Sequence, residues 1–139
     1  MSKPSYAQKL LTGHGFRVTD ARTAVLQLLA LSDKPIAITD MEKYLHKNAV
    51  KADQVTIYRM VEAFTRKGMV SRLDFQEGKF RYELAKTDHH HVICEKCGSV
   101  EDVKECRIEE MEKTITKKQS YLIRRHSLEF FGLCPKCQE

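Results

Sequence analysis

The stretch DQVTIYRMVEAFTRKGMVSRLDFQEGKFRYEL, residues 53–84, predicts a helix followed by a β-hairpin. Four apolar residues recur at the spacing of one helix face and are expected to point into a core: Ile57, Met60, Val61 and Phe64. Gly68 is the expected end of this helix, because glycine commonly follows the last helical residue. After it, MVSRLDF and FRYEL have the composition of strands, and QEGK between them has that of a turn.

Two more helices are predicted upstream of this stretch. In TDARTAVLQLLALS, which begins at Thr19, apolar residues recur at helical spacing, and Thr19 or Asp20 can cap the start. In TDMEKYL, Thr39 and Glu42 have the spacing of a capping box. Three helices followed by a hairpin indicate a winged helix-turn-helix, a fold that places its last helix in the major groove of DNA.

The outward face of that last helix has a composition that suits DNA. Val55, Tyr58 and Arg59 fall opposite the apolar stripe, together with Glu62 and Arg66. Valine and tyrosine can contact the thymine methyl group, whereas arginine can contact guanine or phosphate. An ordinary solvated helix surface is the alternative interpretation.

The positive charge of the chain lies in its first part. The net charge is +5, from 24 Lys and Arg against 19 Asp and Glu. Residues 1–84 hold 14 basic and 9 acidic residues, whereas residues 85–139 hold 10 of each. Phosphate binding explains this excess, and a merely solvated surface explains it equally well.

The second part contains two Cys-x-x-Cys pairs, CEKC at Cys94–Cys97 and CPKC at Cys134–Cys137. Four thiolates in tetrahedral geometry suit zinc and leave no open coordination position, so they predict a structural zinc site. A dithiol redox centre is the alternative. The fifth cysteine, Cys106, is expected to be a small buried hydrophobic residue, with a redox or ligand role as the alternative.

Other features narrow the class of protein. No apolar run is long enough to span a membrane, and MSKPSYAQKL lacks the apolar stretch of a signal peptide, so we expect a cytoplasmic protein. Neither His-Glu-x-x-His nor the His-x-Glu with Pro-Cys-x-x-Cys of zinc deaminases occurs, so we do not expect an enzyme.

Three consecutive histidines precede the first cysteine pair, in TDHHHVIC. If Asp88 to Ile93 form a strand, alternation puts His89 and His91 on one face and Asp88 and His90 on the other. One strand could therefore supply two separate metal sites.

Two downstream segments could complete the second of these sites. YLIRRHSLEFF alternates as a strand that places His126 among core residues, where a metal ligand and a core histidine are both possible. CRIEEMEKTITKKQS is predicted to be a helix that buries Ile108, Met111 and Ile115, with Glu109 as a carboxylate ligand at its edge. Mixed histidine and carboxylate ligands suit reversible binding of zinc, iron or manganese.

The segments VTIYRMVE, HHHVICEKCGSVED, the His126 strand and CPKC together resemble the ferric uptake regulator family, over nearly the whole chain. The resemblance implies an α+β protein with a winged-helix DNA-binding domain over residues 1–84. A small α/β dimerisation domain with a four-cysteine zinc site would follow over residues 85–139. It also implies a homodimeric repressor that binds double-stranded operator DNA when loaded with metal.

The resemblance assigns the site residues as follows. The structural zinc is held by Cys94, Cys97, Cys134 and Cys137. A sensing site consists of Glu83, His89, His91 and Asp102. A second site consists of Asp88, His90, Glu109 and His126. The resemblance also makes Arg17, Tyr58 and Arg59 expected DNA contacts, and Val55 and Thr56 of the same helix are expected to join them.

Two departures from the family pattern bear on the regulatory metal. Pro35 lies near the position where many relatives supply a histidine to the sensing site, and Asp88 stands where a histidine is common. The oxygen ligand makes the second site harder, which weakens the case for zinc there. Iron is the expected regulatory metal, with zinc or manganese as alternatives. A peroxide-sensing regulator of the same family, or a zinc-ribbon interaction module without a DNA role, is the alternative function.

Overall fold

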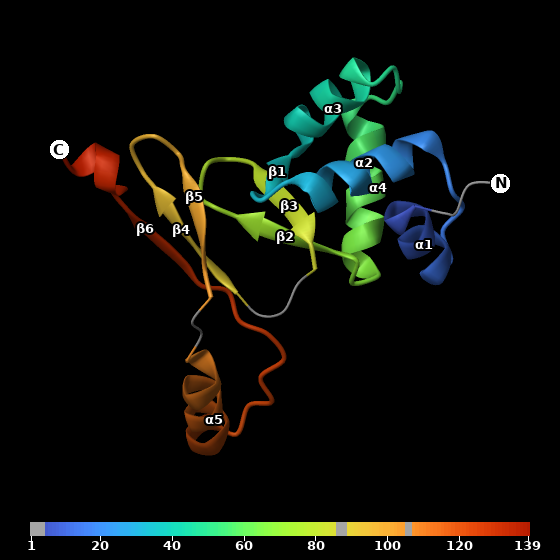
Figure 1. The fold of residues 1–139 in the computed structure, drawn as a ribbon. Helices are drawn as coiled ribbons and strands as arrows, with labels where there is room; N and C mark the ends of the chain where they lie inside the picture. The colour runs from blue at the N-terminus through green and yellow to red at the C-terminus, as the bar shows by residue number, and fades with distance from the viewer. Residues whose placement is uncertain (1–4, 86–88, 105–106) are drawn as a thin grey trace. The chain divides into compact units, whose positions relative to one another are not determined.

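The computed structural model describes residues 5–85, 89–104 and 107–139, which form two compact units, Met1–Ala85 and Lys86–Glu139 (Figure 1). In chain order, the first unit contains α1 (Tyr6–Gly13), α2 (Asp20–Leu31), β1 (Ile36–Ala37), α3 (Ile38–Lys47), α4 (Gln54–Arg66), β2 (Val70–Asp74) and β3 (Phe80–Leu84). The strands form an antiparallel sheet in the order β1-β3-β2. Figure 1 shows the β2–β3 hairpin beside α4.

The predicted winged helix-turn-helix is confirmed in this first unit. On α4, Ile57, Val61 and Phe64 are fully buried and Met60 is partly buried, as the apolar spacing predicts. They share one core with residues of the other helices and the hairpin, among them Leu11, Val25, Leu45 and Tyr82. The side chains of Thr19 and Asp53 accept hydrogen bonds from backbone N–H groups in the first turns of α2 and α4.

The predicted capping box at Thr39 is wrong. The helix α3 begins one residue earlier than Thr39, at Ile38, and its N-cap is Ala37, which carries no side-chain acceptor. Pairing of β1 with β3 fixes Ala37 opposite Arg81, so the sheet sets the start of α3. A capping box does occur at α1, between Ser5 and Gln8.

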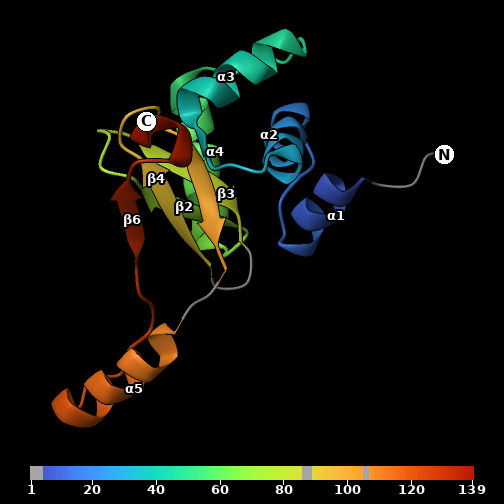
Figure 2. The same ribbon diagram turned by 60° about the vertical axis from the view of Figure 1, so that its left-hand side comes forward.

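The second unit is built around a small mixed sheet (Figure 2). It contains β4 (His90–Cys94), β5 (Val100–Val103), α5 (Ile108–Gln119), β6 (Glu129–Gly132) and the 3-10 turn η1 (Pro135–Gln138). The strand order is β5-β4-β6, with β5 antiparallel and β6 parallel to β4.

Two predictions for this unit are wrong in part. The strand predicted over residues 121–131 forms only from Glu129, so His126 lies outside it. Within the described residues, pairing of β6 with β4 begins with Glu129 opposite His91.

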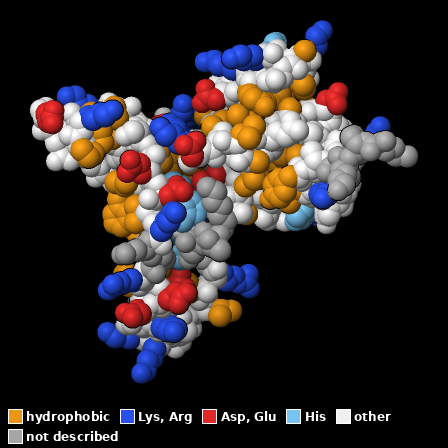
Figure 3. Space-filling view, in the orientation of Figure 1, with side chains coloured by type: hydrophobic (Ala, Val, Ile, Leu, Met, Phe, Trp, Pro, Cys, Tyr) orange, Lys and Arg blue, Asp and Glu red, His pale blue; other side chains and the backbone are white. Residues whose placement is uncertain are grey.

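The helix α5 forms as predicted, but its apolar face is not buried. In the described part of the chain α5 buries none of its side chains, and Met111 is 63% exposed. Figure 3 shows Lys, Arg, Asp and Glu side chains gathered over this helix. Ile108 and Ile115 are half-buried, so the described part of the chain covers this apolar stripe only in part.

Candidate metal sites and DNA-binding surface

The two Cys-x-x-Cys pairs meet because β4 and β6 run side by side in the same direction. Cys94 ends β4 opposite Gly132 of β6, and Cys134 follows two residues later as the N-cap of η1. Gly98, at φ +77°, closes the turn that returns Cys97 toward Cys94, a conformation that side chains with a Cβ rarely adopt. As a result the sulfurs of Cys94, Cys97, Cys134 and Cys137 all lie within 4.8 Å of one another.

The spacing of these sulfurs fits a zinc ion. A tetrahedral ion with Zn–S bonds of about 2.3 Å requires sulfurs about 3.8 Å apart. The Sγ atoms of Cys97 and Cys134 are 3.8 Å apart. The donor set is all sulfur and has no place for a substrate, so the site is structural.

The electrostatics of the cluster also favour a cation. The backbone N–H groups of Cys97 and Cys134 donate to Cys94 Sγ over 3.5 and 3.4 Å and lower the pKa of Cys94 to about 6. The side chain of Cys134 and burial raise the pKa of Cys137 to about 12. The thiol of Cys94 thus ionises readily, whereas that of Cys137 requires a positive charge that offsets the repulsion from its neighbours.

The predicted sensing-site residues of the second unit lie close together, with His91 in β4, His89 directly before it and Asp102 in β5. His89 and His91 have ring centroids 4.8 Å apart, and His91 Nε2 lies 3.5 Å from Asp102 Oδ1. Asp102 lies directly opposite His91 in the β4–β5 pairing. The fourth predicted ligand, Glu83, belongs to β3 of the first unit and is buried.

The opposite face of β4 carries a second histidine pair. The rings of His90 and His126 have centroids 5.1 Å apart. His126 Nδ1 is hydrogen-bonded to the carboxylate of Glu112, one turn along α5 from the predicted ligand Glu109, which is exposed. The fourth predicted ligand, Asp88, lies outside the described residues, as does Cys106.

Sequence reasoning missed Glu112. Its signal was the spacing of three residues from Glu109, which puts both carboxylates on the same side of α5. A carboxylate on Nδ1 orients a histidine ring and leaves Nε2 as the ligand atom. The Glu112 carboxylate therefore orients the His126 ring.

The predicted DNA contacts in α4 are on the surface of the first unit. Val55 is 57% and Tyr58 is 46% exposed, and Thr56, Arg59 and the more distant Arg17 are also exposed. Hydrogen bonds from Thr56 and the nearby charge of Arg59 lower the pKa of Asp53, the N-cap of α4. The start of this helix is therefore held in place and presents its side chains to solvent.

One residue of the outward face has a different role from the one expected. Glu62 accepts a hydrogen bond from Tyr82 Oη at 3.0 Å and pairs with Arg72 Nη1 at 3.3 Å. Burial and the Glu62 carboxylate raise the pKa of Tyr82, so the phenol stays a donor. Glu62 thus ties α4 to the β2–β3 hairpin.

Comparisons with known proteins agree with these features. The model of the ferric uptake regulator family matches residues 13–131. The chain is 34% identical over 130 residues to a ferric uptake regulation protein from Neisseria meningitidis, covering 92% of this chain and 90% of that protein.

Solved structures are similar over the same extent. A ferric uptake regulator from Francisella tularensis solved with iron has a TM-score of 0.77 at 28% identity, covering 90% of this chain and 96% of that one. A ferric uptake regulator from Vibrio cholerae has a TM-score of 0.76 at 30% identity, covering 91% of this chain and 98% of that one.

Among the described residues, no helix combines the length and apolarity needed to cross a bilayer.

Proposed function

Because this chain belongs to the ferric uptake regulator family, we infer that it represses genes of metal homeostasis and that ferrous iron is its regulatory metal. It is a metal-responsive transcriptional repressor and not an enzyme. The observation that carries the proposal is a closed four-thiolate cluster in the same unit as separate histidine and carboxylate groups. Nitrogen and oxygen ligands suit iron, and zinc and manganese are the alternatives.

Each of the three metal sites has a different role in this proposal. Zinc at Cys94, Cys97, Cys134 and Cys137 holds the second unit folded. The proposed sensing site consists of Glu83, His89, His91 and Asp102. The second site consists of Asp88, His90, Glu109 and His126, with Glu112 orienting His126.

Regulation follows from linkage between metal and DNA. A metal that binds more tightly to the DNA-binding arrangement of the two units shifts the protein toward that arrangement. The difference between the free energies of metal binding to the two arrangements then raises the affinity for the operator, typically by about 5- to 150-fold. Glu83 supplies a ligand from the DNA-binding unit, whereas the position of Pro35, buried in the same unit, cannot do so.

The DNA-binding form is a homodimer. The second unit exposes large apolar side chains that a single chain leaves uncovered, among them Met111, Tyr121, Leu122, Phe130 and Phe131. Their cover by the second unit of another copy would bury the apolar stripe of α5. Two α4 helices related by a two-fold axis would then read a palindromic operator.

The metal itself is identified by titration. Protein purified without added metal is first analysed for zinc, and binding to a duplex selected from random DNA is then measured without oxygen against Fe²⁺, Mn²⁺ and Zn²⁺. Tightening of DNA binding at the lowest free concentration of Fe²⁺ is the expected result. Tightest coupling to Mn²⁺ or Zn²⁺ would reassign the metal. Loss of binding on adding hydrogen peroxide would indicate a peroxide sensor.

Tyr58→Ala is expected to weaken binding to the selected duplex by roughly 5- to 150-fold, because a base contact contributes about 1–3 kcal/mol. Binding to random DNA should change little, since Tyr58 is exposed and carries no charge toward phosphate. Competition gel shifts measure the ratio of the two affinities. Tyr58→Phe is the matched control, since it keeps the ring. Equal losses on both duplexes would contradict base readout by Tyr58.

A further inference from the structure

An apolar cavity of about 340 Å³ opens in the first unit where α4, the start of α3 and the β2–β3 hairpin meet. Its lining includes Ile38, Gln54, Val55, Tyr58, Lys79 and Phe80. Val55, Tyr58 and Phe80 are 57%, 46% and 41% exposed, so three large apolar side chains face water here. Val55 and Tyr58 are expected DNA contacts, whereas Phe80 lies at the start of β3.

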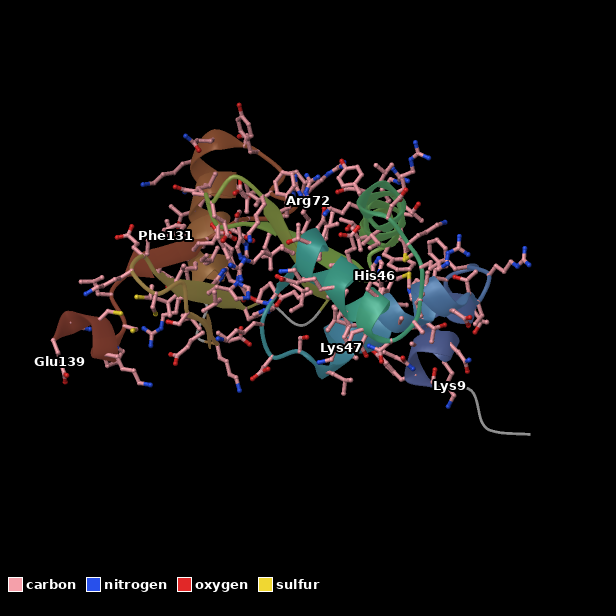
Figure 4. The ribbon with its side chains drawn as sticks, turned by 90° about the horizontal axis from the view of Figure 1, so that it is seen from above. Lys9, His46, Lys47, Arg72, Phe131 and Glu139 are labelled. Carbon is pink, nitrogen blue, oxygen red and sulfur yellow. The ribbon has the colours of Figure 1, made fainter. Side chains whose placement is uncertain are left out.

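The position of Phe80 is fixed relative to α4. The guanidinium of Arg72, labelled in Figure 4, lies 4.5 Å from the centre of the Phe80 ring. The same guanidinium pairs with Glu62 of α4, which also accepts the hydrogen bond from Tyr82 of β3. The stacking of Arg72 on Phe80 and the contacts of Glu62 with Arg72 and Tyr82 together fix the hairpin against α4.

We propose that Phe80 is a specificity-determining residue that contacts a thymine methyl group beside the bases contacted by Val55 and Tyr58. This rests on the proposed function of α4 as the recognition helix. The C5-methyl of thymine is the one apolar group on the major-groove edge of the base pairs, so an apolar surface next to the helix selects for it. Lys79 in the cavity lining supplies positive charge, which matches the phosphates of DNA.

Replacing thymine by deoxyuridine tests the contact directly, because it removes only the methyl group. The probe is a duplex selected from random DNA by the metal-loaded protein, with each thymine replaced in turn. For the unchanged protein, at least one replacement outside those sensed by Tyr58 should weaken binding about fourfold, the effect of one buried methyl group. In Phe80→Ala that sensitivity should disappear, while sensitivity at the thymines contacted by Tyr58 remains.

Two controls separate this contact from a general loss of structure. Phe80→Leu keeps an apolar side chain and should keep most of the methyl sensitivity. Melting temperatures of both variants should match the unchanged protein, since Phe80 is substantially exposed. A Phe80→Ala protein with the same pattern of thymine sensitivity as the unchanged one would overturn the inference and leave the proposed function standing. An unchanged protein without metal-stimulated DNA binding would overturn both.

Discussion

Replacing Cys94 by serine is expected to remove about one zinc ion per chain and to unfold the second unit. That unit has little else to stabilise it, since its buried hydrophobic residues in the described part are Ile93, Cys94 and Val100. Zinc binding at such sites contributes about 10–16 kcal/mol in small peptides. This matches or exceeds the whole stability of a typical domain, about 5–15 kcal/mol.

The first unit should survive the loss of zinc. Its core joins four helices and the hairpin and contains no cysteine. The circular dichroism signal of the variants should therefore keep the helical contribution of α1 to α4. Cys137→Ser should behave like Cys94→Ser because both sulfurs belong to the cluster. Size-exclusion chromatography should show the dimer lost in both variants.

Cys106→Ser is the matched control for these variants. Cys106 is the one cysteine of the five that no Cys-x-x-Cys pair contains, and its change should leave the zinc content as it was. Zinc is measured by metal analysis and folding by thermal melting. A Cys94→Ser protein that stays folded and dimeric without zinc would show that the site does not stabilise the unit.

The parts of the fold that were predictable depend on local sequence. The burial of Ile57, Val61 and Phe64 follows from spacing along one helix, because residues three and four apart share a face. The hairpin follows from two short strands and the turn between them. The meeting of the two cysteine pairs was predictable for another reason. Two Cys-x-x-Cys pairs in one chain are typical of a four-thiolate zinc site, and such a site requires the pairs to come together.

The parts that failed depend on partners that local sequence does not reveal. Alternation in residues 121–131 predicted a strand, but a strand also needs a partner, and pairing with β4 is formed only from Glu129 onward. The apolar spacing of α5 predicted a buried face, but the described chain offers no surface to cover Met111. Glu62 was expected to face solvent, and the distant Tyr82 and Arg72 draw it against the hairpin instead.

The two histidine groups should differ in what their loss does. His89→Ala or His91→Ala is expected to abolish the metal response of DNA binding, a loss of roughly 5- to 150-fold in metal-loaded affinity, while leaving a folded dimer. His126→Ala should instead lower the melting temperature or raise the metal concentration required, with some response retained. The reason is that His89 and His91 lie close to each other and His91 lies beside Asp102, whereas His126 lies with His90.

Metal titration calorimetry and gel shifts on the same preparations separate binding from response. His89→Ala should lose one metal-binding event together with the response, and the zinc of the four cysteines should remain. Glu112→Gln is the matched variant for the other face, because it weakens the hydrogen bond that orients His126 without removing a ring. It should resemble a milder His126→Ala.

Because Pro35 stands where many relatives have a histidine, the role of Glu83 in the metal response can be tested separately. A sensing site that lacks a histidine from that position depends on Glu83 as its ligand from the DNA-binding unit, so Glu83→Gln should uncouple metal from DNA while His89 and His91 still bind the ion. Metal binding retained without the DNA response is therefore the expected result for Glu83→Gln. If His126→Ala alone abolished the response and His89→Ala left it intact, the roles of the two faces of β4 would be reversed.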